Sequence, residues 1–318
     1  MKKFLVFTGL LIIFFNILQI DAYAFFKSTK FTVIVIDEKG KPISGVRVGV
    51  GFEKNIGWGT NSSGKQGTTD SDGKLTFSGQ SNGHITYGGK KDGYYPSYYN
   101  YDFKDLGVFG WKPWNPELKV VMRKIENPVP MYARRAAIKI PTIGKDIGFD
   151  LSAYDWVAPY GHGKIADFIF HLEKKFSSGD NYDGKLRIKF SNKGDGVLKI
   201  TENLDAGSVF KLPRYAPKGN YKNNLNIETS QSPSGKWVIG FSQNDNYIFR
   251  IRTEVKNGKI IKAVYGKIRG PIKLEPRDKP TKVFFIYYLN PDFTRNLEFD
   301  PKQNLFRNLN EFQTVSKP

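Results

Sequence analysis

The feature that most restricts the fold of this chain is a succession of short apolar or alternating runs, each of strand length. The runs cover residues 31–36, 46–52, 75–77, 118–122, 186–190, 237–241, 247–255, 259–268 and 282–288. Pairs such as Asp72-Gly73, Asp183-Gly184 and Asn257-Gly258 stand beside them, and these residues tolerate the positive φ that tight turns between twisted strands require. The pattern predicts an all-β chain made of β-sandwich-like domains.

One segment is open to two interpretations. Between residues 163 and 176, Ile165, Phe168, Ile169 and Leu172 form an i, i+3, i+4, i+7 stripe that suits a helix. The same stretch also partly alternates, as a buried strand does. We favour a strand.

The N-terminus has the three parts of a secretory signal peptide. Lys2 and Lys3 are followed by an apolar run over 4–20 and by Ala22-Tyr23-Ala24, which has the small-x-small pattern of a cleavage site. We therefore expect a cleaved signal peptide over 1–24 and a mature protein that is exported to the periplasm, the cell surface or the extracellular space.

A transmembrane anchor is the competing interpretation of this run. It is short for a hydrocarbon core of about 30 Å and contains Gly9, Asn16 and Gln19. No basic stop-transfer cluster follows it. No later stretch approaches the length of apolar sequence that a span needs, so we expect no transmembrane span in the mature chain.

The chain is long enough for two domains. Pro128 and Pro130 interrupt the strand-like pattern and read as an extended connector. We predict a first domain over 27–125, a linker over 126–135 and a C-terminal β domain over 136–312.

Four segments of the first domain carry a resemblance to a known family. They are residues 33–37, 40–48 with Pro42, Gly45 and Val46, 69–77 with Asp72-Gly73, and 91–94. Together they resemble the carboxypeptidase regulatory-like, transthyretin-like β-sandwich family. The resemblance implies a sandwich in which Asp72-Gly73 closes the central hairpin. It indicates little about function, because this family mostly supplies accessory modules. The second domain is similar only to C-terminal domains of uncharacterised exported bacterial proteins.

Two segments are longer than the family pattern requires. Residues 53–68 are rich in Gly, Asn and Ser, and residues 94–114 are rich in aromatic side chains. We expect both to be loops that a rigid sandwich displays for binding.

Composition narrows the chemistry. The chain has no cysteine, which excludes disulfides, thiolate nucleophiles and cysteine-ligated zinc. A formal net charge of +19 favours an anionic partner, such as an envelope glycan, a lipid headgroup or an envelope protein. The lysines are scattered rather than clustered, however, and they also protect strand edges. Nucleic acid is not expected, because an exported chain seldom meets it and no nucleic-acid-binding module is present.

Aromatic side chains gather between Tyr87 and Trp114 and are interspersed with lysines. Rings with polar tips suit stacking on sugars or contact with partner surfaces, whereas the competing interpretation places them in the sandwich core. Because consecutive tyrosines on a strand point to opposite faces, some must be exposed. The residues predicted to bind a ligand are Tyr94, Tyr98, Tyr99, Trp111 and Trp114.

No catalytic residue, metal site or cofactor is predicted. The chain has only three histidines, and a metal set of His162, Asp167 and His171 requires a helix that we do not favour. Two carboxylate pairs, Asp150 with Asp155 and Glu298 with Asp300, could in principle cleave a glycan. Carboxylates in such pairs are usually solvated or form an ion pair with a nearby arginine.

The sequence as a whole indicates a non-catalytic exported protein that binds or scaffolds at the cell envelope. Two alternatives remain open at this point. One is an envelope glycan hydrolase with its acidic residues in the second domain. The other is a structural subunit that pairs its β edges with another protein.

Overall fold

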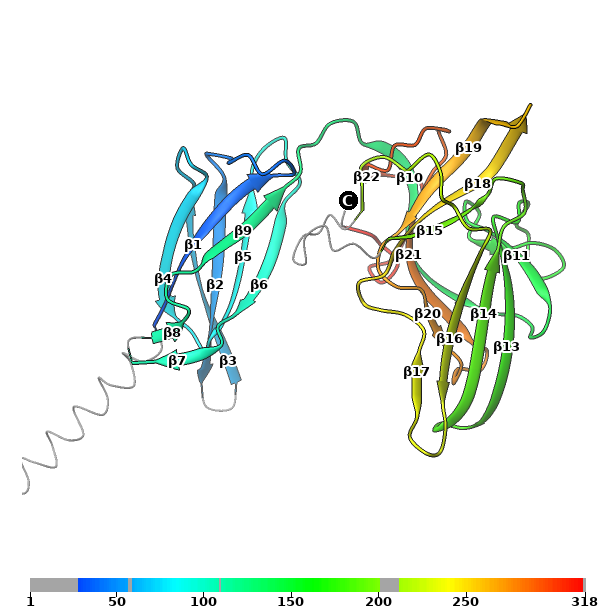
Figure 1. Ribbon diagram of the computed structural model, residues 1–318, viewed down its shortest axis with the longest axis horizontal. Helices are drawn as coiled ribbons and strands as arrows, with labels where there is room; N and C mark the ends of the chain where they lie inside the picture. Colours follow the sequence, from blue (N-terminus) through cyan, green and yellow to red (C-terminus); the bar gives the residue numbers. More distant parts are fainter. Residues whose placement is uncertain (1–27, 57–58, 109, 201–211, 317–318) are drawn as a thin grey trace, which may run out of the picture. The chain divides into compact units, whose positions relative to one another are not determined.

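The structure is a computed structural model that describes residues 28–56, 59–108, 110–200 and 212–316 (Figure 1). The signal peptide predicted over 1–24 lies outside the described residues. Every regular element within these ranges is a strand, which confirms the all-β prediction. The described part of the chain contains no helix that is long and apolar enough for a membrane span.

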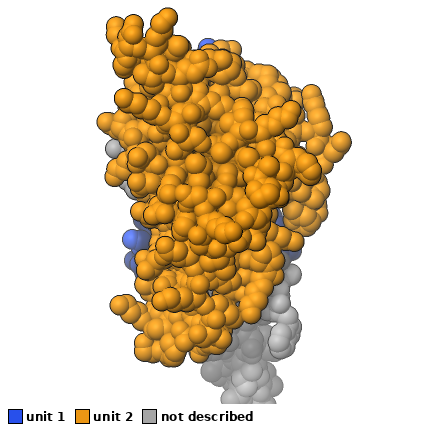
Figure 2. Space-filling view, turned by 90° about the vertical axis from the view of Figure 1, so that its right-hand side faces the viewer, with its two compact units in different colours: residues 1–125, 205–209 blue, residues 126–204, 210–318 orange. Residues whose placement is uncertain are grey.

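The chain forms two compact units, drawn in two colours in Figure 2. The first comprises residues 1–125 and 205–209, and the second comprises residues 126–204 and 210–318. The main break therefore follows residue 125, where the sequence pattern changes.

The first unit has two principal sheets (Figure 1). One has the order β4-β1-β9, from β1 (Ser28–Asp37), β4 (Lys74–Gln80) and β9 (Glu117–Met122). The other has the order β3-β2-β5-β6, from β2 (Arg47–Ile56), β3 (Gly59–Thr68), β5 (His84–Lys90) and β6 (Ser97–Asp102). The short strands β7 (Asp105–Gly107) and β8 (Gly110–Lys112) form a separate pair.

The core of the first unit lies between these sheets because each strand buries alternate side chains. Strand β1 contributes Phe31 and Val33, and strand β2 contributes Val48, Val50 and Phe52. All five are almost fully buried. The unit is thus a β-sandwich, as predicted.

Asp72-Gly73 does not close a hairpin, contrary to our expectation. The turn joins β3 of one sheet to β4 of the other, and β4 pairs with β1. Gly73 has a φ of +71°, and a Cβ atom there would lie 2.6 Å from the carbonyl oxygen of Val35. The dipeptide is needed because the turn packs against β1, which the local sequence does not reveal.

The prediction of a binding loop over 53–68 is also wrong. Strands β2 and β3 pair along their whole length, from Arg47 with Thr68 to Ile56 with Gly59. Glycine and serine have low strand propensity, but the neighbouring backbone of β2 supplies the hydrogen-bonding partners that keep β3 extended.

The second unit is a larger pair of sheets (Figure 1). A seven-stranded sheet has the order β15-β18-β19-β21-β10-β22, with β20 also paired to β21. Its strands are β10 (Val129–Lys139), β15 (Gly196–Ile200), β18 (Asn246–Lys256), β19 (Lys259–Ile268), β20 (Lys273–Glu275), β21 (Lys282–Asn290) and β22 (Phe299–Asn304).

The other sheet of this unit has six strands in the order β12-β11-β13-β14-β16-β17. They are β11 (Asp146–Asp150), β12 (Asp155–Trp156), β13 (Phe168–Ser178), β14 (Asn181–Lys189), β16 (Asn224–Gln231) and β17 (Trp237–Ile239). Phe149, Phe170 and Leu186 from this sheet share one buried cluster with Phe285 and Tyr287 from the seven-stranded sheet. The segment with two interpretations is a strand from Phe168 onward.

The boundaries of the second unit differ from the prediction at both ends. Most of the predicted linker, 126–135, belongs to β10. Pro130 is accommodated because it lies at the start of the strand, where the register with β22 shifts between Val129 and Met131. Beyond 312, Val315 is buried in a cluster with Met131 and Ala133, so the folded unit continues into the tail.

A turn was expected at Asp183-Gly184, but this dipeptide lies inside β14. The chain reverses direction before it, between Ser178 and Asn181. Gly184 is required for a different reason. A Cβ atom at this position would lie 2.5 Å from Cγ of Pro276. The glycine permits close packing rather than a turn.

We predict that Gly184→Ala lowers the free energy of unfolding by about 1–3 kcal/mol, because the added methyl group overlaps Pro276. Gly179→Ala is the matched control, since nothing lies within 4 Å of a Cβ atom there, and its effect should stay within about 1 kcal/mol. Urea unfolding at neutral pH measures both. Equal effects of the two substitutions would contradict the packing role of Gly184.

Candidate ligand-binding groove

The predicted ligand-binding aromatics do not share one surface. Tyr99 is only 7% exposed, and its ring stacks on Tyr87 at a centroid distance of 5.5 Å. The backbone N–H of Val121 donates to its hydroxyl at 3.0 Å. Tyr99 is therefore a core side chain, which corrects its prediction as a ligand-binding residue.

Trp111 and Tyr94 pack against the same core and are partly buried. The indole Nε1–H of Trp111 donates to the carbonyl oxygen of Ser81 at 2.9 Å, so its polar edge is used within the fold. Lys91 lies near the ring of Tyr94, with Nζ 6.0 Å from the centroid. These contacts give Trp111 a mainly structural role.

Tyr98 and Trp114 are each 52% exposed. Tyr98 borders a groove with a volume of about 590 Å³ on the outer face of the β3-β2-β5-β6 sheet, and Trp114 does not. The buried Tyr99 is also among the residues that line this groove. Exposure of Tyr98 follows from the alternation of β6, since its neighbours Ser97 and Tyr99 both point inward.

The floor of this groove is made by glycines. Gln66, Gly49, Gly88 and Tyr98 follow one another across the four strands as register partners, so all four lie on one face of the sheet. The two central positions have no side chain. A trough therefore runs between Gln66 on one side and Tyr98 on the other.

The ring of Tyr98 leans over this floor. A Cβ atom at Gly88 would lie 2.6 Å from Cδ1 of Tyr98 and 2.5 Å from the carbonyl oxygen of Ser97. Only glycine fits at position 88. By contrast, nothing lies within 4 Å of a Cβ atom at Gly49, where the trough is open.

Polar side chains complete the lining. Thr86 and Asn100 are register partners on β5 and β6, and Arg47 and Lys90 are partners on β2 and β5. No carboxylate lines the groove. The site therefore offers one aromatic ring, several hydrogen-bonding groups and two cations around an open floor.

The carboxylates considered for glycan cleavage are occupied by structural contacts. Asp150 is 3% exposed and accepts hydrogen bonds from the backbone N–H groups of Ser152, Ala153, Lys164 and Ile165. Burial by itself raises the pKa of Asp150, but these hydrogen bonds outweigh it and hold the pKa below its ordinary value.

Its partner Asp155 accepts from the backbone N–H groups of Trp156 and His162. The two carboxylates thus fix the connection around β12. The carboxylate oxygens accept hydrogen bonds from the backbone, whereas a catalytic acid or nucleophile needs an oxygen that can reach the substrate.

Glu298 has a comparable role. It is 4% exposed, accepts hydrogen bonds from the N–H groups of Glu126 and Asn127, and forms an ion pair with Arg214 at 2.5 Å. Burial by itself raises the pKa of Glu298, but the hydrogen bond from Arg214 and the two backbone donors outweigh burial and hold the pKa below its ordinary value. Asp300 accepts from the N–H of Lys302. Glu298 therefore holds the entry to β10 in place.

The histidine and aspartate residues considered for a metal are dispersed. His162 is fully exposed, Asp167 pairs with Arg252 at 2.8 Å, and His171 lies 2.7 Å from Asp146. Within the described ranges, no three His, Asp or Glu side chains are grouped to hold a metal ion.

Sequence reasoning missed Gly49, Gly88 and Gln66. The sequence contains one indication of this face, because Gly49 and Gly51 alternate with apolar residues in a strand and so lie opposite its core residues. The sequence does not indicate that β2 pairs with β5. It is this pairing that places Gly49 beside Gly88.

Comparisons with known proteins identify no family. No family model matches the chain, and no curated protein matches it. Among solved structures, the chain is similar to a streptococcal ancillary pilin with a TM-score of 0.23 and 12% identity, covering 77% of this chain and 60% of that one.

Two other similar structures are BcpA, the major pilin subunit of Bacillus cereus, and the major pilin SpaD of Corynebacterium diphtheriae. For BcpA the TM-score is 0.25 with 12% identity, covering 86% of this chain and 100% of that one. For SpaD the TM-score is 0.26 with 11% identity, covering 88% and 85%. Scores this low carry no inference about function.

We predict that Glu298→Gln destabilises the protein at neutral pH by about 1–3 kcal/mol, because it removes the buried carboxylate beside Arg214 and leaves only the more exposed Glu126 to pair with it. A lowered carboxyl pKa stabilises the fold above the unfolded-state value, and this contribution is lost as pH falls through the folded-state value. The difference from wild type should therefore shrink below a pH of about 4.5.

Urea unfolding at neutral and at acidic pH measures this difference. Glu311→Gln, a change at an exposed carboxylate, is the control and should have an effect within about 0.5 kcal/mol at both pH values. A difference between Glu298→Gln and wild type that does not change with pH would contradict the ion-pair role.

Proposed function

We propose that this chain is a non-catalytic exported protein of the cell envelope whose first unit binds a glycan in the groove beside Tyr98. The observation that carries the proposal is the combination of an exposed ring with a glycine floor. A half-exposed tyrosine ring at the edge of an open trough offers a stacking surface to a flat ligand that lies on the glycine floor.

The chemistry of the lining suits a sugar. One face of a pyranose ring is apolar and stacks on an aromatic ring, while its hydroxyl groups need donors and acceptors of the kind that Gln66, Thr86 and Asn100 supply. The groove volume of about 590 Å³ falls within the range of ligand sites. Arg47 and Lys90 favour an acidic sugar.

Export supports a ligand at the envelope. The basic start, apolar run and cleavage pattern over 1–24 are features of the sequence, and they would deliver the chain outside the cytoplasm. The net charge of +19 adds long-range attraction to anionic envelope components.

We also propose that the first unit is a carboxypeptidase regulatory-like module. The segments that carry the resemblance fall on β1, on the start of β2, on the turn into β4 and on the turn before β6. A sandwich is consistent with that family, and modules of this kind serve as accessory units.

A structural subunit is the second candidate, and one edge strand favours it. Strand β3 forms an edge of its sheet, is ten residues long, and contains no proline and a single charged residue, Lys65. Edges are usually protected by charges, prolines or bulges, so this edge is open to pairing with another chain.

If β3 pairs with another chain, Ser63→Lys should weaken the association, because it adds a second cation beside Lys65 on the same face of the edge strand. Ser62→Ala is the control on the same strand. Sedimentation over a wide concentration range and gentle co-purification measure assembly. A wild-type protein that is monomeric and alone in both would eliminate this candidate.

For the groove, Tyr98→Ala should weaken glycan binding about tenfold, since it removes the stacking surface. Gly49→Val should abolish binding by filling the trough, while the fold persists because nothing lies within 4 Å of its Cβ atom. Screening against neutral and acidic oligosaccharides, followed by calorimetry at low and physiological salt, measures both effects.

Trp114→Ala is the matched control, because Trp114 has the same exposure as Tyr98 but does not line the groove. It should leave binding unchanged. Absence of binding to every oligosaccharide, or full binding by Gly49→Val, would overturn the proposal.

A further inference from the structure

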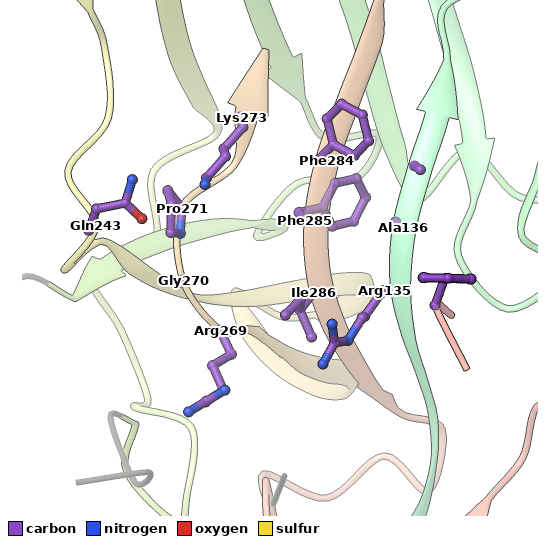
Figure 3. A pocket seen from close by; sticks show the side chains of 12 residues that line it. Arg135, Ala136, Gln243, Arg269, Gly270, Pro271, Lys273, Phe284, Phe285 and Ile286 are labelled. Atoms are coloured by element: carbon purple, nitrogen blue, oxygen red, sulfur yellow. The ribbon is translucent and has the colours of Figure 1, made fainter. Parts of the chain in front are cut away.

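A second cavity lies in the second unit, on the outer face of the seven-stranded sheet. It has a volume of about 620 Å³ and is formed by β10, β20 and β21 with the segment before β20 (Figure 3). It shares no residue with the groove beside Tyr98.

The floor of the cavity is apolar. Strand β21 buries Phe285 and Tyr287 in the core, so the alternate residues Phe284 and Ile286 turn to the outer face, where both remain partly exposed. Pro271 faces them across the cavity in Figure 3. Phe312, which is 78% exposed, also lines it. An apolar group of a ligand would therefore find contacts on several sides.

Three cations surround this floor. Arg135 on β10 is the register partner of Ile286, and the N–H of Arg269 donates to the carbonyl oxygen of Ile286 at 2.9 Å from the opposite side. Lys273 on β20 is the partner of Phe284. Cross-strand neighbours lie on the same face of a sheet, so the two arginines flank Ile286 and the lysine lies beside Phe284.

No carboxylate lines the cavity. Within the described residues, Arg135, Arg269 and Lys273 form no ion pair with a carboxylate. Nε of Arg269 is buried without a hydrogen-bond partner. Two other arginines of this unit each pair with a buried carboxylate, Arg252 with Asp167 and Arg214 with Glu298.

This arrangement carries a free-energy cost. Arg135 and Arg269 lie on either side of β21, and the buried Nε–H of Arg269 has no acceptor, which costs about 1–3 kcal/mol. An anion placed between the two arginines would supply that acceptor and balance their positive charges. The apolar floor requires in addition that the anion carry a hydrophobic body.

We propose that this cavity binds an amphipathic anion, a carboxylate or phosphate attached to an apolar chain. The anionic group lies between Arg135 and Arg269 above Ile286, and the apolar chain covers Phe284 and Pro271. Lys273 adds positive potential at the other end of the cavity. Free amphiphiles and lipids of an anionic membrane share this chemistry, and the experiment separates them.

The test uses the purified full chain and calorimetric titration with decanoate and decyl phosphate, each below its critical micelle concentration. Decanol and decyltrimethylammonium have the same chain without the negative charge, and inorganic phosphate has the charge without the chain. We expect the two anionic amphiphiles to bind and the other three to bind at least about tenfold more weakly.

Arg269→Gln and Arg135→Gln should each weaken the binding of decyl phosphate by about tenfold or more. Lys139→Gln is the matched control, because Lys139 is an exposed cation on the same face of β10 but does not line the cavity. Thermal unfolding of each variant establishes that it is folded, and a variant that fails this criterion is replaced by Ala137→Phe, which fills the cavity from its exposed side.

Binding of decanol as tight as that of decanoate would overturn the role of the cations. Binding of inorganic phosphate as tight as that of decyl phosphate would overturn the role of the apolar floor. An unchanged affinity in both arginine variants would place the ligand elsewhere. Titration with vesicles of phosphatidylglycerol separates the two sources, since a free amphiphile predicts no vesicle binding and a membrane lipid predicts binding that Arg269→Gln reduces.

Discussion

Both units depend on the burial of one face of each sheet against its partner sheet. The chain has no cysteine and its described residues contain no helix, so neither disulfides nor helical packing contributes to the core. Alternate side chains such as Phe31 and Val33 in the first unit, or Phe285 and Tyr287 in the second, supply the apolar area instead. Because the side-chain period of a strand is two, this demand also fixes which residues face outward.

Both proposed sites lie on outer faces of sheets, one in each unit. The two sites differ in the residues that form the floor of the depression. In the first unit, Gly49 and Gly88 leave a floor without side chains beneath Tyr98. In the second, Phe284 and Ile286 provide an apolar floor, and Arg135 and Arg269 stand on the strands to either side. The first design suits a flat ligand with many hydroxyl groups, and the second suits a ligand with one charge and an apolar body.

In the second unit, some charged side chains form buried ion pairs that stabilise the fold, whereas others are available to bind a ligand. Arg252 holds Asp167 and Arg214 holds Glu298, and the carboxylates also accept backbone hydrogen bonds that fix the neighbouring turns. Breaking such a pair leaves an uncompensated charge, which is why these residues serve stability. Arg135 and Arg269 differ from these two because no carboxylate lines their cavity, so their charges are available to an anionic ligand.

The sequence by itself determined the all-β class, because that class follows from a local period of two in the strands. It favoured a strand over the segment that contains Phe168, and it required some of the consecutive tyrosines of β6 to be exposed without deciding which. It did not determine which strands pair. Strand β1 pairs with β4 and with β9, which begins at Glu117 far along the chain, and such pairing makes Asp72-Gly73 a crossing between sheets rather than a hairpin. The groove and the cavity likewise exist only through register partners such as Gly49 with Gly88 and Arg135 with Ile286. Tertiary structure decided these features, since contacts between distant segments depend on the packing of the whole sheet and leave no local pattern in the sequence.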